Sequence, residues 1–98
     1  MSSDVYTEAD WKLFRKRVPD WQENYMQRLL DEYAAIMASS EPPSTKFWAL
    51  EERISKDQRD VGVLVDMRRS RLVYNLTMLL KEGAITRDDL DGFSESLV

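Results

Sequence analysis

The sequence predicts an all-α fold, a single domain over residues 1–98 with four or five helices packed around a central helix near residues 64–82. Three observations support this prediction. Apolar residues recur at helical spacing along most of the chain. Patterns typical of helix N-termini precede several apolar segments, and proline or glycine stands where such segments end. The expected helices span 8–18, 20–38, 45–57, 64–82 and 87–97, and residues 1–6 are expected to be disordered.

A proline separates the first two expected helices. Thr7 is the expected N-cap of the first, with Asp10 as its capping-box partner. Pro19 is expected to end that helix, because the residue before a proline avoids helical geometry. Asp20 then caps the second helix. The apolar face of the second helix is formed by Trp21, Tyr25, Leu29, Tyr33, Ile36 and Met37, and Met26 and Leu30 widen it.

A connection rich in serine and proline, residues 39–44, separates the second helix from the third. Paired prolines with serines favour an extended loop, and this one is too short to link two domains. Ser44 or Thr45 is the expected N-cap of the third helix. The apolar stripe of that helix is formed by Phe47, Leu50 and Ile54, with Trp48 beside it.

The expected central helix has two apolar faces. The broad face comprises Val65, Leu72, Val73, Leu76, Leu79 and Leu80. The narrow face comprises Met67, Tyr74 and Met78. An ordinary surface helix has one apolar stripe, so two faces indicate neighbours on both sides. The alternative is that the narrow face is exposed and docks a partner.

A glycine followed by a capping box predicts a C-terminal helical hairpin. Gly83 fits the C′ position, where left-handed backbone geometry ends the central helix. Thr86 fits the N-cap of the last helix, with Asp89 as its box partner. The helix over 87–97 is then expected to fold back on the central one.

Composition removes several classes of function. The chain has no cysteine and no histidine, which excludes the commonest nucleophile–base pairs and the usual zinc ligands. We therefore expect no enzymatic activity, no metal and no cofactor. The longest apolar run, residues 33–38, is far shorter than the roughly 20 residues of a membrane span. The first residues do not resemble a signal peptide, so we expect a cytoplasmic protein that does not enter the membrane.

Aromatic and methionine residues are numerous, with three Trp, four Tyr and five Met among 98 residues. Such side chains dominate both cores and protein interfaces. Any that the core does not hold will form an apolar patch, which indicates a protein partner or a second copy of the chain. The candidate interaction residues are Trp21, Trp48, Met67, Tyr74 and Met78.

Basic residues cluster in the second half of the chain, although the net charge is −4. Arginine and lysine contact phosphates, so nucleic acid is the alternative partner, and a solvated helix surface is the competing interpretation. The candidate nucleic-acid residues are Arg53, Lys56, Arg59, Arg68 and Arg71. Arg69 instead falls within the broad apolar face. We expect it to pair with a carboxylate of the last helix, Asp91 or Glu95.

Four segments, 10–16, 21–23, 46–51 and 89–94, together resemble a group of small bacterial proteins of unknown function. Such proteins are sometimes named multidrug transporters, a name that does not fit a chain without an expected membrane span. The resemblance implies no catalytic or binding residue. The sequence therefore predicts a small cytoplasmic protein-interaction or regulatory module that binds an unknown protein or a second copy of itself. A nucleic-acid-associated regulator is the alternative.

Overall fold

The computed structural model describes residues 6–95 and residue 97. This part of the chain contains three α-helices, two short 3-10 helices and no strand, which confirms the all-helical class for the described residues. The expected disorder of residues 1–6 falls, apart from Tyr6, outside them. In chain order the elements are α1 Glu8–Met37, α2 Pro43–Asp57, the 3-10 helix η1 Arg69–Arg71, α3 Leu72–Lys81 and the 3-10 helix η2 Arg87–Leu90.

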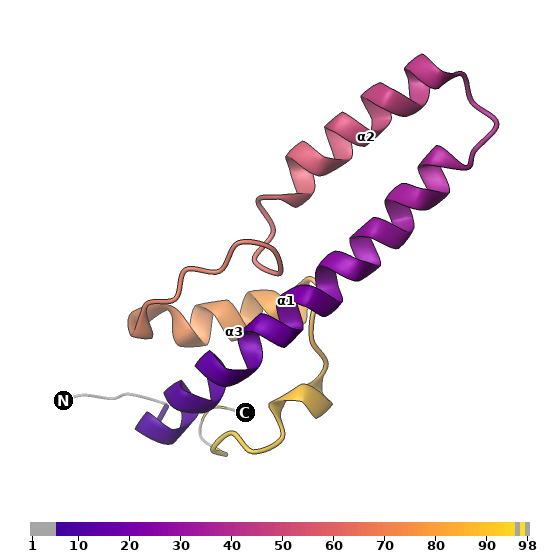
Figure 1. Cartoon of the computed structure of the whole chain (residues 1–98). Coiled ribbons are helices and arrows are strands. Elements are labelled where there is room, and N and C mark those ends of the chain that lie inside the picture. Colours follow the sequence, from indigo (N-terminus) through magenta and orange to yellow (C-terminus); the bar gives the residue numbers. More distant parts are fainter. Residues whose placement is uncertain (1–5, 96, 98) are drawn as a thin grey trace.

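The molecule is elongated, with principal extents of 58 × 23 × 18 Å, and α1 runs along most of its length (Figure 1). The N-terminal half of α1 packs against η1, α3 and the C-terminal segment that contains η2. We call this part the body. The C-terminal half of α1 lies beside α2, which runs back along it, and we call these two helical segments the hairpin (Figure 1). Residues 58–68 connect the hairpin to the body through turns and extended backbone.

Pro19 lies inside α1 and does not end it. The expected helices 8–18 and 20–38 are therefore one helix, and the expected cap at Asp20 is wrong. The predicted count of four or five helices is not confirmed for the described residues. The element on which the others pack is α1, and not the segment 64–82 that was expected to be central (Figure 1).

The packing around Pro19 explains why the helix continues. Proline has no N–H to donate to the carbonyl of Arg15, and its ring crowds the preceding turn. Pro19 itself is exposed, whereas Val18 and Trp21 on the opposite side of the helix are buried. Burial of one continuous apolar stripe on both sides of the proline outweighs the lost hydrogen bond.

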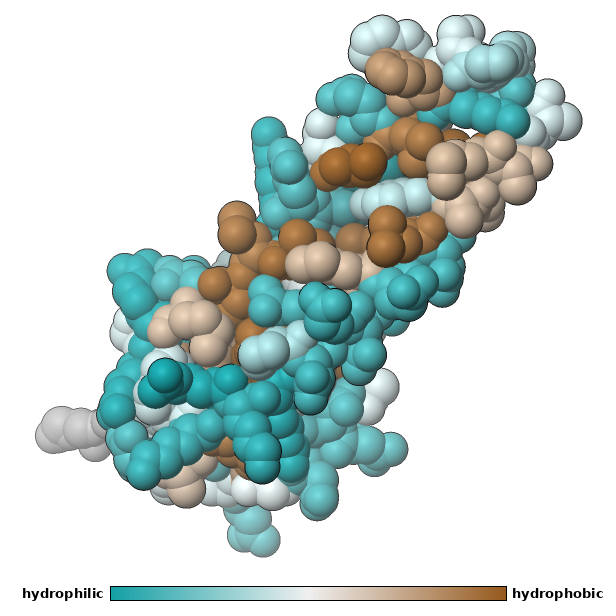
Figure 2. Space-filling model, in the orientation of Figure 1, coloured by the Kyte–Doolittle hydropathy of each residue, from teal (hydrophilic) through white to brown (hydrophobic). Residues whose placement is uncertain are grey.

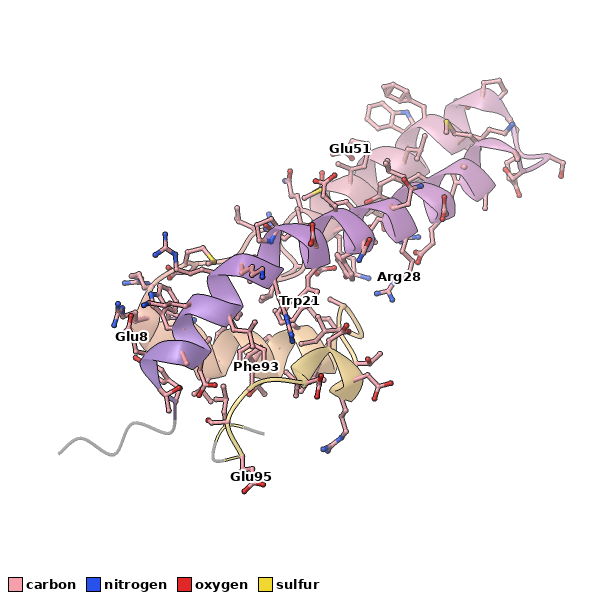
Figure 3. All side chains as sticks on the ribbon, turned by 60° about the horizontal axis from the view of Figure 1, so that its bottom comes forward. Glu8, Trp21, Arg28, Glu51, Phe93 and Glu95 are labelled. Atoms are coloured by element: carbon pink, nitrogen blue, oxygen red, sulfur yellow. The ribbon has the colours of Figure 1, made fainter. Side chains whose placement is uncertain are left out.

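The body has a closed aromatic core. Phe14 is completely buried, and its ring centroid lies 6.2 Å from those of both Trp11 and Trp21. Trp21 also meets Phe93 of the C-terminal segment at 6.5 Å, and the two side chains point toward each other (Figure 3). The buried residues of this core are Trp11, Phe14, Val18, Trp21, Leu72, Leu76, Leu79, Ile85, Leu90 and Phe93.

α3 begins at Leu72, later than the expected helix over 64–82. Residues 65–68 have no helical structure. Arg68 donates to both carboxylate oxygens of Asp66, and residues two apart face the same side in extended backbone but not in a helix. The buried Asn75 amide donates to the Asp66 carbonyl at 2.8 Å. This contact, between residues nine apart, holds the segment out of helical geometry and outweighs its helical periodicity.

In place of the expected helix over 87–97 the structure has the short 3-10 helix η2, so that expected helix is wrong. The C-terminal helical hairpin that it would form with the central helix is not confirmed. The Arg17 guanidinium on α1 donates to the carbonyls of Asp89 and Asp91. Those carbonyls would otherwise accept helical hydrogen bonds. Gly92 then has a φ of +96°, a left-handed conformation that takes the chain out of helical geometry.

The local signals at two helix starts and one helix end are confirmed. Thr7 with Asp10, and Thr86 with Asp89, form complete capping boxes. Gly83 follows the last residues of α3 with a φ of +75°, as the C′ position requires. These signals involve residues close together in the chain, which explains why spacing alone predicts them.

α2 begins at a proline. Pro42 is its N-cap and Pro43 its first helical residue, so the expected cap at Ser44 or Thr45 is wrong. Proline suits this position because the N–H that it lacks would have no partner in the first turn. α2 then ends at Asp57, as expected.

Asp10 fastens the start of α1 to the C-terminal segment. Its buried carboxylate accepts hydrogen bonds from the Thr7 N–H at 2.9 Å, the Ser94 N–H at 2.8 Å and the Ser94 hydroxyl at 2.6 Å. Burial acts to raise the pKa of Asp10, but the hydrogen bonds from Ser94 and Thr7 outweigh it and hold the pKa below its ordinary value. The bonded, ionised form of Asp10 therefore stabilises the body.

Candidate protein-interaction surface

The contact between α1 and α2 contains a small apolar core. Tyr25, Leu29 and Tyr33 of α1 are buried there, and Leu50 of α2 and Val63 of the connection pack against them while partly buried. Two helices can cover only one side of each other. The outer side of the hairpin is therefore left to solvent.

Polar side chains occupy the α2 side of this contact. The buried Asp57 carboxylate accepts a hydrogen bond from the Tyr33 hydroxyl at 2.7 Å. Arg53 lies 3.3 Å from the same carboxylate, also bonds to Glu32 of α1, and sits 5.6 Å from the centre of the Tyr33 ring. Because these groups take up the side of α2 that faces α1, its large apolar residues lie farther round the helix.

The two tyrosines of this contact retain their protons to high pH. Burial of the hydroxyl, followed by its hydrogen bond to Asp57 and the charge of that carboxylate, raises the pKa of Tyr33 to about 12. The Tyr25 hydroxyl donates to Asp60 at 2.7 Å, and burial together with this carboxylate raises the pKa of Tyr25 as well. Each hydroxyl is the donor to an anion, so the contact requires both tyrosines to be neutral.

The hairpin exposes a continuous apolar surface, which we call the hairpin face. Its residues are Met26, Leu30 and Met37 of α1 and Phe47, Leu50 and Ile54 of α2. Leu30, Met37, Phe47 and Ile54 are between 47% and 62% exposed. A groove of about 180 Å³ between the two helices brings Met26 and Leu30 together with Ile54. Figure 2 shows apolar side chains along both helices of the hairpin on one side of the molecule.

An aromatic pair extends the hairpin face toward the turn between the helices. The Trp48 ring packs edge-to-face on that of Phe47, with the centroids 5.0 Å apart. Trp48 is 63% exposed. Exposed tryptophan is costly in water and is enriched among the residues that dominate binding energy at interfaces. This pair is therefore the strongest candidate anchor for a partner.

The other four candidate interaction residues lie in the body or in the segment leading to it. Trp21 is 7% exposed and belongs to the aromatic core, so it is not at the surface. Met67 and Tyr74 are exposed and Met78 is half-buried. Met67 precedes α3 in extended backbone, so these three residues do not form the helical stripe that a helix over 64–82 would present.

Three of the candidate nucleic-acid residues form ion pairs with carboxylates of the chain itself. Arg53 belongs to the contact between α1 and α2, and both Arg68 and Arg71 approach Asp66. Arg71 also lies 4.0 Å from the centre of the Tyr74 ring. The remaining candidates, Lys56 and Arg59, are exposed. The basic segment therefore presents less uncompensated charge than its sequence indicates.

Arg69 pairs with the start of α1. Its guanidinium donates to both carboxylate oxygens of Glu8 and lies 5.6 Å from the centre of the Trp11 ring. The expected pairing with Asp91 or Glu95 is wrong. Because α3 starts later than expected, Arg69 stands in η1 and is about half exposed, and it does not enter the apolar face of a helix.

The sequence indicated the members of the hairpin face but not their exposure. The spacing of Phe47, Leu50 and Ile54 predicts an apolar stripe, and such stripes usually face the core. A signal to the contrary was available. Arg53 and Asp57 follow Leu50 by three and seven residues, so they share its side of the helix and make the inward side of α2 partly polar.

Neither a metal site nor a membrane span is found in the described part of the chain. No group of three or more acidic, cysteine or histidine side chains is placed to hold a metal ion, and no helix is long and apolar enough to cross a bilayer. Comparisons of the chain with protein-family models, curated proteins and solved structures found no match. The resemblance to small bacterial proteins therefore stays a prediction, and a functional proposal has to rest on the hairpin face.

Proposed function

We propose that the protein is an interaction module whose hairpin face binds an amphipathic helix of another protein. One observation carries this proposal: the hairpin gathers large aliphatic side chains of both helices, each about half exposed, along one groove, whereas most large apolar side chains of the body are buried in its core. Contiguous exposed apolar surface typically marks a protein-interaction site. A groove between two helices is a common receptor for a third helix.

The geometry of the groove fits a helical partner. Leu30 on α1 and Ile54 on α2 line it from the two helices, and the buried Leu29 lines it as well. Side chains at positions i, i+3, i+4 and i+7 of an incoming helix would pack between these two rows, as in helical bundles. The aromatic pair Phe47 and Trp48 would anchor one end of that helix.

Two other partners remain to be distinguished. A second copy of the chain would use the same face, and nucleic acid would use the basic residues between Arg53 and Arg71. The pairing of Arg53, Arg68 and Arg71 with carboxylates gives the nucleic-acid alternative less support. A phosphate-driven complex would also weaken steeply with added salt, which an apolar complex would not.

Site-specific photo-crosslinking tests the proposal. A photoreactive phenylalanine analogue is placed at position 30 or 54 in the hairpin face, and at position 73 as a control. Val73 is similarly exposed but lies on α3 of the body. We expect positions 30 and 54 to crosslink to the same segment of one protein in the native host, at high salt and after nuclease treatment, and position 73 not to do so.

Three outcomes would overturn this proposal. Equal crosslinking from positions 30, 54 and 73 would show that contact does not depend on the hairpin face. Crosslinks between two copies of the chain would make the partner a second copy. Recovery of nucleic acid that is lost at high salt would move the function to the basic segment.

A further inference from the structure

Acidic side chains border the hairpin face on both helices. On α2, Glu51 lines a second depression together with Phe47, Leu50 and Ile54, and this depression shares Ile54 with the groove between the helices. Glu51 is exposed and projects outward (Figure 3). On α1, Glu23 precedes Leu30 by seven residues and therefore lies along the same edge of the helix. Glu23 is exposed too.

The basic side chains of the hairpin are directed elsewhere. Arg28 donates to the Gly83 carbonyl at 2.9 Å and lies over the Tyr25 ring, which turns it toward the body (Figure 3). Arg53 is engaged in the contact between α1 and α2. Lys56 follows Ile54 by two residues and lies on the opposite side of α2.

Within the groove itself the charged residues are also acidic. Among the described residues, the charged one that lines the groove is Asp57, and the charged one that lines the neighbouring depression on α2 is Glu51. Arg53 already pairs with Asp57. Lys46 precedes Arg53 by seven residues, so it lies on the side of α2 that faces α1, and it is half-buried. The borders thus carry uncompensated negative charge around an apolar centre.

We infer that the helix received by the hairpin face is basic, with lysine or arginine flanking its apolar stripe. This inference rests on the proposed function and specifies the partner. Cations at the edges of the incoming helix would complement Glu23 and Glu51. Complementary charge of this kind raises the rate of association and fixes how the incoming helix aligns with the groove. A two-fold contact with a second copy would instead place acidic borders near one another, because both partners then present the same surface.

Two synthetic peptides test the inference. Each has about 18 residues, or five helical turns, with leucine at the i, i+3, i+4 and i+7 positions of one face. The remaining positions are lysine in one peptide and glutamate in the other. Binding of the labelled peptides to the full chain is followed by fluorescence anisotropy at moderate salt. We expect the lysine peptide to bind at least about tenfold more tightly than the glutamate peptide.

Matched variants separate local charge from net charge. The double variant Glu23→Gln/Glu51→Gln removes two negative charges beside the hairpin face. The control Asp88→Asn/Glu95→Gln removes two exposed negative charges from the C-terminal segment, and Glu95 lies far from Glu51 (Figure 3). We expect the first variant to bind the lysine peptide about threefold or more weakly, and the control to leave its affinity unchanged. Circular dichroism confirms that both variants fold.

The outcomes distinguish this inference from the function on which it rests. Equal binding of both peptides, lost in Leu30→Ala/Ile54→Ala, would overturn the basic partner and keep the hairpin face as a docking site. Binding that Leu30→Ala/Ile54→Ala does not weaken would overturn both proposals. A stable dimer in sedimentation equilibrium, dissociated by the same two substitutions, would make the occupant a second copy.

Discussion

The body and the hairpin share α1 but stabilise themselves differently. In the body, side chains from α1, α3 and the C-terminal segment enclose Phe14 completely. In the hairpin, the buried apolar residues are Tyr25, Leu29 and Tyr33, and both tyrosines donate hydrogen bonds to carboxylates. The body therefore depends mainly on apolar burial, whereas the hairpin depends in large part on a few polar contacts.

This difference indicates where function lies. A segment that buried its large apolar residues for its own stability would have none left at the surface. The hairpin instead leaves the hairpin face in solvent and fastens its helices to each other through Tyr33, Arg53 and Asp57. Such an arrangement leaves an apolar surface free for a partner, and each prediction below tests one side of this comparison.

The largest effect is expected in the body. Phe14→Ala removes a fully buried ring that contacts Trp11 and Trp21. Loss of that burial and the resulting cavity should lower the free energy of unfolding by about 3–5 kcal/mol. Urea denaturation followed by far-ultraviolet circular dichroism measures this loss. A decrease below about 1 kcal/mol, within the range of surface substitutions, would contradict the closed core.

Loss of the Asp10 anchor should have the next largest effect. Asp10→Asn removes a charged acceptor of hydrogen bonds from Thr7 and Ser94. Bonds to charged groups contribute about 1.5–3 kcal/mol, so we expect a loss of about 2 kcal/mol at neutral pH. Urea denaturation measures this loss.

The same hydrogen bonds of Asp10 make the stability of the body depend on pH. The pKa of Asp10 is lowered in the folded protein. Its stabilisation is therefore present above the unfolded value of about 3.9 and is lost as the pH falls through the lower folded value. Urea midpoints between neutral pH and pH values below about 4 should fall more steeply for the natural chain than for Asp10→Asn. Parallel profiles would show that Asp10 does not contribute this dependence.

In the hairpin, Tyr33→Phe tests the hydrogen bond that holds α2 against α1. The substitution removes the hydroxyl that donates to the buried Asp57 carboxylate at 2.7 Å, while Arg53 still pairs with that carboxylate. We expect a loss of about 1 kcal/mol. Hydrogen exchange should become faster at the amides of α2 and stay unchanged at those of α3. Equal acceleration in α3 would mean that the hairpin and the body do not open separately.

Alkaline pH should weaken the hairpin through the same hydroxyl. The pKa of Tyr33 rises to about 12 in the folded chain, against about 10 for an unperturbed tyrosine. A raised folded pKa means that its contribution is complete below about pH 10 and is lost as the pH rises toward the folded value. The natural chain should therefore lose more stability than Tyr33→Phe between pH values of about 9 and 11. Tyr25 contributes in the same direction and remains in both proteins.

The features that the sequence predicted well are local ones. The capping boxes at Thr7 and Thr86 and the glycine stop at Gly83 each involve residues only a few positions apart, and all three are present. Helical periodicity likewise predicted the apolar stripes of α1 and α2. A local signal of this kind needs no knowledge of what the segment packs against.

The features that the sequence missed depend on contacts between different segments, which the spacing within one helix does not show. Pro19 stays helical because the core continues on both sides of it. The segment before α3 stays out of helical geometry because Asn75 binds the Asp66 carbonyl, and η2 stays short because Arg17 binds one carbonyl within it and one directly after it. The exposure of the hairpin face also depends on tertiary packing, and the partly polar inward side of α2 was the one signal of it in the sequence.

The smallest effect on stability is expected for the surface that matters most for the proposed function. Leu30→Ala and Ile54→Ala truncate side chains that are 57% and 47% exposed. Because about half of each side chain already lies in solvent, each substitution should lower the free energy of unfolding by less than about 1 kcal/mol. Together they should nevertheless weaken binding of the lysine peptide by about tenfold, since truncated anchors cost most where they are buried by a partner. A loss of stability above about 1 kcal/mol from either substitution would instead place the hairpin face within the chain's own core.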